Sequence, residues 1–451
     1  MIRRSTLIAV EILLALVAAL VIGTAVAWWR LSQGPIELNA IREHVQAELS
    51  AARGGRPVGI EGVQLAWSER SALELRAVGI TIEDGRGGVL STLDRARLEL
   101  NVLPLLIGRI SLQRAEFEGG ALTFTRKING AVHIAFGPEG SPADIIIDPP
   151  PPNETLEQRV ARVLDSMEDA FRPVGPGGGL RELSVRSADL TIIDDGGGRW
   201  TADGANFELA RRGRSLALSA DARLEGADGL APANLRITTD TRFTSAVIEF
   251  GAENVRPRAI FSQAALGPFA GLDAPMTARI SVGLDREVGV NQFDGDVEFG
   301  RGSAAMGGGR FDLEGGRLRG RYDIATDELI IDQIAFAGDR TRIDGEVRIR
   351  DVTRIMRADP NEPAAFDISL PSARLAMPGT FAEPVAFSNV RLVGSIVSAE
   401  PSIRFTQLTA QTGEGTIHAT GRVYWAEAGA GDGGFHGSSE RLPGGKFPER
   451  S

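Results

Sequence analysis

The residue types that most often carry chemistry are sparse in this sequence. Its four histidines, His44, His133, His418 and His436, are far apart and have unrelated neighbours. A metal centre needs several ligands at compatible spacing, and nothing here resembles an H-E-x-x-H motif or a Cys/His cluster. The chain has no cysteine, which excludes disulfide scaffolds, cysteine nucleophiles and thiolate metal sites. We therefore expect neither a metal ion nor a cofactor.

Three glycine-containing stretches are the next candidates for chemistry. Asp194–Gly198 could hold calcium or phosphate, but its place between Ile192 and Trp200 is typical of a hairpin loop. Met306–Gly309 and Gly177–Gly179 lack the order of strand, glycine loop and helix that a phosphate cradle needs. No G-x-S-x-G elbow occurs. We predict that the protein is not an enzyme; a site built from residues distant in sequence is the alternative.

Composition narrows the class further. The chain of 451 residues is 43% hydrophobic and 24% charged, which is unlike a disordered chain or a multi-span membrane protein. Its formal net charge is -10 and its arginines are scattered among acidic residues, so no basic stripe indicates nucleic acid. The many glycines, 55 in all, favour short strands joined by tight turns.

The N-terminus predicts export. Arg3 and Arg4 precede an apolar run from Thr6 to Trp29. As a helix, residues 6–29 would be about 36 Å long, enough to cross a hydrocarbon core of about 30 Å. Ala25–Ala27 also has the form of a signal-peptide cleavage site, so a cleaved signal peptide is the alternative. In both cases the basic residues stay cytoplasmic, and we expect the rest of the chain outside the inner membrane.

Alternation of apolar and polar residues dominates the chain after the first 54 residues. The stretch Asn101–Arg126 is an example, because Ile110, Leu112, Leu122 and Phe124 all alternate with polar neighbours. Such a period of two predicts strands with one dry face and one wet face. An ordinary β-sandwich core gives the same pattern. Periodicity alone therefore does not distinguish a filled core from an open apolar face.

Two helices interrupt the strands. The first spans residues 35–53. The second spans about Glu154–Phe171, where Thr155 and Gln158 have the spacing of a capping box. We interpret residues 138–180 as a helical insertion on a β scaffold. The predicted apolar faces of the two helices are Leu38, Ile41, Val45 and Leu49, and Leu156, Val160, Val163, Leu164, Met167 and Phe171.

Weak repetition favours an elongated array. Leu329–Ile349 and Ile403–Trp425 both contain a strand, a polar turn and a closing strand, with Gly345 and Gly421 at equivalent places. Repetition of hairpin-sized units is more typical of an array than of a compact enzyme domain. The glycine-rich segment from Glu427 onward has no period and predicts a disordered tail.

The predicted fold class is mainly β. It has an N-terminal transmembrane helix, then an elongated, curved antiparallel β-groove of repeated hairpin units with a helical insertion. An open apolar face of this kind could hold acyl chains, at about 25 cal/mol per Å² of apolar surface removed from water. The predicted domains are a membrane anchor (1–30), a first β-groove unit with a leading helix (31–137), a Pro-rich linker with an amphipathic helix (138–180), further β-groove repeats (181–426) and the tail (427–451).

Several segments of the first 136 residues occur in a characteristic order after the N-terminal anchor. They are Gly34–Ile36, Val63–Trp67, Gly88–Leu90 and the run 93–126, which includes a Leu-Leu-x-Gly-Arg step at Leu105, Leu106, Gly108 and Arg109. Together they resemble the AsmA-like family, most closely its YhdP-type members. The segment from Leu180 to Leu209 looks like the next repeat of that family.

The resemblance implies a single-pass inner-membrane protein, anchored through residues 6–29, with the bulk of its chain in the periplasm of a Gram-negative host. It implies binding or conduction of phospholipids along an apolar β groove toward the outer membrane. Members of this type are usually far longer, so a shuttle that needs a partner is an alternative to a full bridge. A membrane-anchored structural or assembly factor of the cell envelope, with a filled β core and protein partners, is the second hypothesis.

The resemblance also assigns a lining to the groove. We expect the dry faces of the strands to solvate acyl chains, so that no single residue is essential. A register slip of one residue would reverse the face that points inward. The expected lining residues are Val63, Leu65, Trp67, Leu98, Leu100, Val102, Ile110, Leu112, Leu122 and Phe124, with Phe207 and Leu209 from the next unit.

Overall fold

The protein is described by a computed structural model, which is mainly β. The strands of the described residues form one large, mostly antiparallel sheet of 23 strands and a separate sheet of three strands. Among the described residues, no helix is both long and apolar enough to span a membrane. The predicted anchor, residues 6–29, lies outside the described residues, as do Val102 and Ile110. The structure describes residues 30, 33–52, 55–68, 72–101, 112–149, 151, 154–171, 180–194, 198–259, 271–306, 309–353, 363–375, 383–397, 402–413, 415–424 and 435–438.

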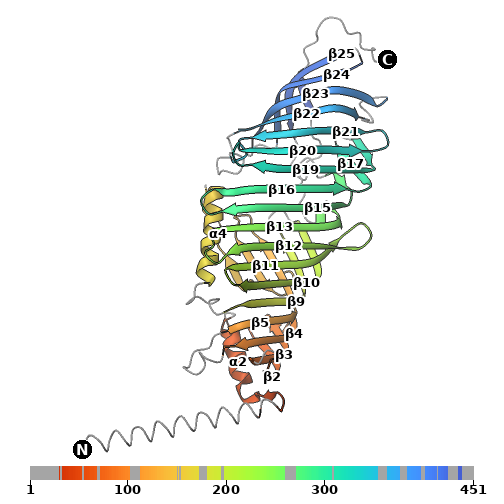
Figure 1. Ribbon diagram of the computed structural model, residues 1–451. Helices are drawn as coiled ribbons and strands as arrows, with labels where there is room; N and C mark the ends of the chain where they lie inside the picture. The colour runs from red at the N-terminus through yellow and green to blue at the C-terminus, as the bar shows by residue number, and fades with distance from the viewer. Residues whose placement is uncertain are drawn as a thin grey trace, which may run out of the picture.

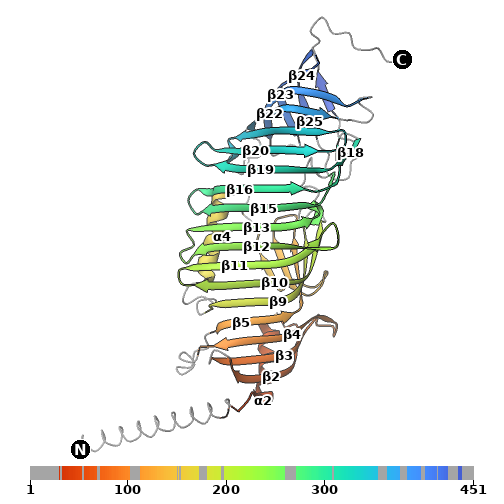
Figure 2. The ribbon, with the colours of Figure 1, turned by 45° about the vertical axis from the view of Figure 1, so that its right-hand side comes forward.

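The strands follow one another as an elongated stack, which the two views in Figures 1 and 2 show from β2 to β25. The first half contains β1 (Ile36–Glu37), β2 (Val58–Trp67), β3 (Leu73–Glu83), β4 (Val89–Leu100), β5 (Leu112–Gly119), β6 (Ala121–Arg126), β7 (Val132–Phe136), β8 (Ile145–Ile147), β9 (Glu182–Ile193), β10 (Arg199–Arg212), β11 (Ser215–Glu225), β12 (Leu230–Asp240) and β13 (Ser245–Val255). The second half contains β14 (Leu272–Asp273), β15 (Met276–Asp285), β16 (Gly289–Phe299), β17 (Gly302–Met306), β18 (Gly309–Leu313), β19 (Gly315–Asp323), β20 (Glu328–Ala337), β21 (Arg342–Arg350), β22 (Pro363–Leu375), β23 (Val385–Val397), β24 (Ser402–Thr412), β25 (Gly415–Tyr424) and β26 (Phe435–Ser438).

Nearly all neighbouring strands are antiparallel, and the exception is at β9. The first half of β9 pairs in parallel with β5, and its second half pairs in parallel with β6. Gly119 and Gly120, with φ of 82° and 93°, allow the chain to turn between these two strands. We call β6, β7 and β8 the wing; its orange strands lie behind the green strands β10–β13 in both views (Figures 1 and 2). The predicted insertion 138–180 is therefore not purely helical, because β8 extends the wing.

Two helices lie against the sheet, as predicted. α2 (Asn39–Ala52) packs on the first strands, and α4 (Leu156–Phe171) crosses the ends of β10–β16 (Figure 1). The predicted capping box of α4 is confirmed, because the Gln158 N–H donates to Thr155 Oγ1 at 3.2 Å and the Thr155 N–H donates to Gln158 Oε1 at 3.0 Å. Leu49 and Val163 lie on the exposed side of their helices rather than on the buried one.

The two repeated segments are both hairpins. β20–β21 and β24–β25 each contain a bulge in the first strand, between Ile331 and Ile334 and between Phe405 and Leu408. The prediction of a disordered tail is wrong for residues 435–438, which form β26 and pair with β25. The other residues of the predicted tail lie outside the described residues.

Candidate functional site

One face of the main sheet is apolar along its whole length. Directly paired residues share a face, so following the register from strand to strand traces a row of side chains. The row that begins at Val63 on β2 and ends at Ala419 on β25 contains no polar residue. We call it the central row: Val63, Ala77, Ala96, Phe117, Val185, Phe207, Ala220, Leu235, Phe250, Ile280, Gly295, Gly320, Ile331, Val347, Ile368, Leu392, Leu408 and Ala419.

The described members of the predicted lining all lie on this apolar face. Val63 and Phe207 belong to the central row itself. Leu65, Leu98 and Leu209 belong to the adjacent row, which continues through Leu218, Ile237 and Ile248 to Phe293. Trp67, Leu100 and Leu112 form a third row, and Leu122 and Phe124 lie on the wing, where they pair with Leu190 and Ile192.

Val63 departs from the predicted role of an open lining residue. Its exposed fraction is 1%, and it packs in a core with Val58, Ile60 and Ile80, against which Val45 of α2 also lies. A side chain sealed in this way has no surface left for a ligand. The other described lining residues are half-buried, so they keep part of their apolar surface accessible.

Helix α4 covers a second part of the apolar face. Val160 and Leu164 of the helix pack against Leu216, Phe243 and Ala246. Arg286 fixes the helix from the side, because its Nη2 lies 2.6 Å from Asp165 Oδ1 and 2.8 Å from Glu168 Oε2. The pKa of Arg286 is raised, mainly by its hydrogen bond to Glu168. Ion pairs that are partly exposed contribute little free energy, so apolar packing is the main attachment of α4.

Glycines on the apolar face let large side chains fold over neighbouring strands. Gly316 lies between Phe299 and Phe336, whose rings stack at 5.7 Å. A Cβ at Gly316 would approach the Phe336 ring to 2.5 Å. Gly394 has the same position between Phe366 and Phe405. Glycine inside a strand marks a tight bend, and an aromatic neighbour covers the gap that it leaves.

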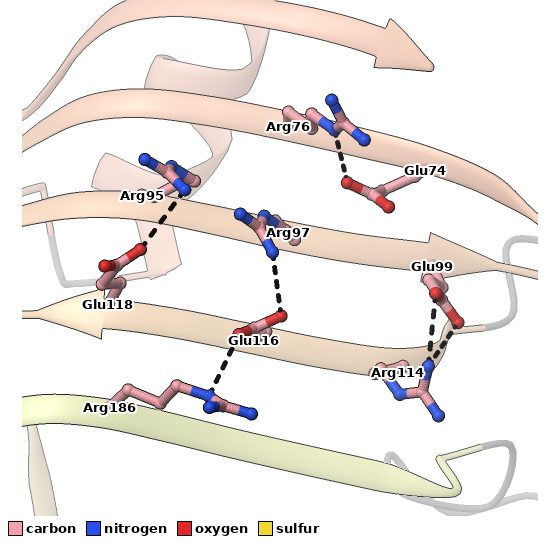
Figure 3. Close-up of polar contacts among 9 residues, drawn as sticks. All are labelled: Glu74, Arg76, Arg95, Arg97, Glu99, Arg114, Glu116, Glu118 and Arg186. Atoms are coloured by element: carbon pink, nitrogen blue, oxygen red, sulfur yellow. Dashed lines mark hydrogen bonds and ion pairs between the residues drawn. The ribbon is translucent and has the colours of Figure 1, made fainter. Parts of the chain in front are cut away.

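The opposite face carries charged side chains in cross-strand pairs, shown for β3, β4, β5 and β9 in Figure 3. Glu116 Oε2 accepts from Arg97 Nη1 at 3.4 Å, and Glu116 Oε1 lies 3.2 Å from Arg186 Nε. Arg114 pairs with Glu99 at 3.2 Å and with Glu182 at 2.7 Å. The face opposite the apolar rows is therefore the polar face of the sheet.

A hollow that was not predicted lies against this charged face. Its volume is about 900 Å³, and it extends over β11, β12, β13, β15, β16 and β19. Charged-face residues such as Arg236, Glu249, Asp294 and Arg321 line it. These charged residues alternate with apolar residues in each strand. Ordinary strands with one solvated face have the same alternation, so the sequence pattern does not predict a hollow. Leu235, Phe250 and Ile280 of the central row also line the hollow, so its lining combines charges of both signs with apolar residues.

No group of three or more His, Cys, Asp or Glu residues lies close enough to hold a metal ion in the described part of the chain. The groups with shifted pKa serve local structure. Arg162 lowers the pKa of Glu154 at the start of α4, and burial together with a hydrogen bond to Asp327 raises the pKa of Tyr322 to about 12.

Comparison of this chain with family models, with curated proteins and with solved structures finds no match.

Proposed function

We propose that this protein is anchored in the inner membrane of the cell envelope and holds phospholipid acyl chains on the apolar face of its sheet. The central row carries the proposal, because it stays apolar without interruption from β2 to β25. The stability of separate hairpins does not require such continuity. Each hairpin alone would need only a local dry face. Continuity across the bulges and across the parallel junction at β9 supports a ligand that moves or lies along the stack.

Accessibility also supports this function. A core that existed only for stability would bury its large side chains, as the residues beneath α2 are buried. Leu98, Leu100 and Leu112 are instead half-buried and belong to neither helix-covered core. Covering such surface with acyl chains gives about 25 cal/mol per Å². The resemblance of the N-terminal segments to the AsmA-like family points to the same ligand and to the periplasm.

A structural or assembly factor of the envelope is the second candidate. The cores under α2 and α4 favour it, because a helix fills the apolar face at both places. On this hypothesis the half-buried rows would be covered by a protein partner rather than by lipid.

Native mass spectrometry of the full chain, purified in mild detergent from a Gram-negative host, tests the proposal. We expect copurified phospholipid in the unaltered protein and less in Leu100→Asp and Phe124→Asp. Thr92→Asp is the matched control, because Thr92 is an exposed residue of β4 on the charged face. Circular dichroism must report the same strand content in all variants.

Lipid-free protein that is monodisperse and stable would overturn the lipid proposal and favour the structural factor. Equal lipid content in Leu100→Asp, Phe124→Asp and Thr92→Asp would show that lipid binds elsewhere on the chain.

A further inference from the structure

A second, smaller hollow lies where β13 and β16 end and the three-stranded sheet β14–β17–β18 begins. Its volume is about 370 Å³. We call it the arginine hollow, because three arginines contribute to its lining. The residues that matter for its chemistry are Arg256, Asp273, Arg301, Ser303, Arg310 and Asp312.

The three-stranded sheet places these groups on one side. Ser303 pairs with Asp273 on one neighbour and with Asp312 on the other, so the three side chains share a face. Alternation along β18 puts Arg310 on the same face as Asp312. Leu272 and Leu313 belong to the opposite face, and Leu313 is buried. The small sheet is thus polar toward the hollow and apolar on its other side.

The charges of the hollow are only partly neutralised. Arg256 is neutralised, because its Nη1 lies 2.9 Å from Asp273 Oδ1 and its Nε lies 3.7 Å from Glu225 Oε1. Within the described residues, the side chains of Arg301, Arg310 and Asp312 make no ion pair and no hydrogen bond. Two guanidinium groups and one carboxylate therefore remain available in a single concave site.

The hollow adjoins the apolar face directly. Arg256 follows Val255, whose exposed fraction is 0%, and Pro275, which also lines the hollow, precedes the buried Met276. Arg301 lies two residues after Phe299, which packs against the same core of Val255 and Met276. This core is sealed, so the tails of a bound molecule would lie on the half-buried Val297 and Phe299 at its edge, with the polar end beside the three arginines.

We propose that the arginine hollow binds a zwitterionic phosphodiester headgroup, with the phosphate on Arg301 and Arg310 and the ammonium on Asp312. This inference rests on the proposed function and adds a substrate class to it. Guanidinium groups match phosphate oxygens in a planar, two-pronged geometry. A phosphodiester has one negative charge, and the unpaired carboxylate of Asp312 is the complement of a primary ammonium group. A headgroup without the ammonium would leave Asp312 unpaired beside the phosphate.

Titration calorimetry with water-soluble headgroups tests the site independently of acyl chains. The full-length protein in detergent is titrated with glycerophosphoethanolamine, glycerophosphoglycerol and inorganic phosphate. We expect the first to bind tightest. The double variant R301Q/R310Q should weaken binding of both phosphodiesters by roughly 100-fold or more, because it removes the charge-assisted hydrogen bonds of two guanidinium groups to the phosphate. Asp312→Asn should weaken the ethanolamine compound alone, and exposed Arg340→Gln is the control.

The outcomes separate this inference from the proposed function. If R301Q/R310Q binds the headgroups as the unaltered protein does, the assignment of the hollow is overturned, even where copurified phospholipid persists. Equal affinity for inorganic phosphate and for glycerophosphoethanolamine would identify a free-phosphate site instead of a headgroup site. Loss of selectivity in Asp312→Asn together with lipid-free protein would support the hollow and overturn acyl-chain binding on the apolar face.

Discussion

The apolar face is treated differently at the two ends of the molecule. At the N-terminal end, α2 seals Val58, Ile60 and Val63 into a dry core. From β19 to β25 neither α2 nor α4 belongs to the core, and aromatic rings lie over glycines instead, Phe336 over Gly316 and Phe366 over Gly394. Phe366 and Phe405 are buried there, at 4% each, whereas Phe336 and Leu392 are half-buried. The same alternation thus gives a helix-covered core in one region and, in the other, a face that its own aromatic rings bury in part and leave open in part.

The largest effect is expected from a charge placed in the sealed region. Val63→Asp should lower the free energy of unfolding by about 4 kcal/mol or more, because the carboxylate would be buried without a partner. Leu98→Asp, in the adjacent row but half-buried, should cost much less, since its carboxylate can reach water. Urea denaturation followed by circular dichroism measures both. Equal losses would mean that the rows beside α2 are as dry as the core beneath it.

Loss of packing under α4 is expected to have the next largest effect. Leu164→Ala should destabilise the protein by about 3 kcal/mol, because the side chain is 1% exposed and its removal leaves a cavity. Val163→Ala is the matched control on the same helix, where the side chain is 47% exposed and little change is expected. Thermal unfolding compares the two. A large effect of Val163→Ala would indicate that the other side of α4 is also covered.

A glycine substitution examines the open region. Gly394→Ala should destabilise by about 1–3 kcal/mol, because the added Cβ would lie 2.1 Å from the Arg404 carbonyl oxygen and 2.6 Å from the Phe366 ring. Gly62→Ala, on β2 with no atom within 4 Å of the added Cβ, should be neutral or slightly stabilising. Chemical denaturation of both variants is the measurement. A neutral Gly394→Ala would show that the sheet relaxes there without relying on this close approach.

The smallest effect is expected from pH. Burial and the hydrogen bond to Asp327 raise the pKa of Tyr322 from 10.0 to about 12, so the folded state favours the neutral phenol. The stabilising contribution is therefore complete below pH 10 and is lost as the pH rises toward 12. Ultraviolet titration of phenolate, with Tyr322→Phe as the reference, measures the shift. A Tyr322 that titrates near its ordinary pKa would contradict the packing around Asp327.

Local features were predictable from the sequence, whereas long-range ones were not. The capping box of Thr155 and Gln158 depends on residues three apart, and the shared face of Leu65, Leu98 and Leu209 follows from alternation. The sealing of Val63 depends on where α2 packs, which no period specifies. The wing depends on Gly119 and on pairing with β9 far along the chain.

The arginine hollow was missed for a related reason. Arg256, Arg301 and Arg310 lie in three separate segments, and each looks like an ordinary surface arginine in the sequence. Only the close approach of β14, β17 and β18 brings them to one site. A sequence motif would require a fixed number of residues between the three arginines. The turns between these segments set no such fixed spacing.

The parallel pairing of β5 with β9 has a consequence for how the chain folds. Most other pairs are adjacent hairpins, which close short loops quickly, but Arg114 and Glu182 are 68 residues apart. Closing that loop has a larger entropic cost than closing a hairpin loop. The two strands are also not joined by a short turn from which their pairing could start. The sheet on each side of this junction can therefore form early and separately. Joining the two at β9 is expected to be the slow step, and β5 and β9 would have unpaired edges until then.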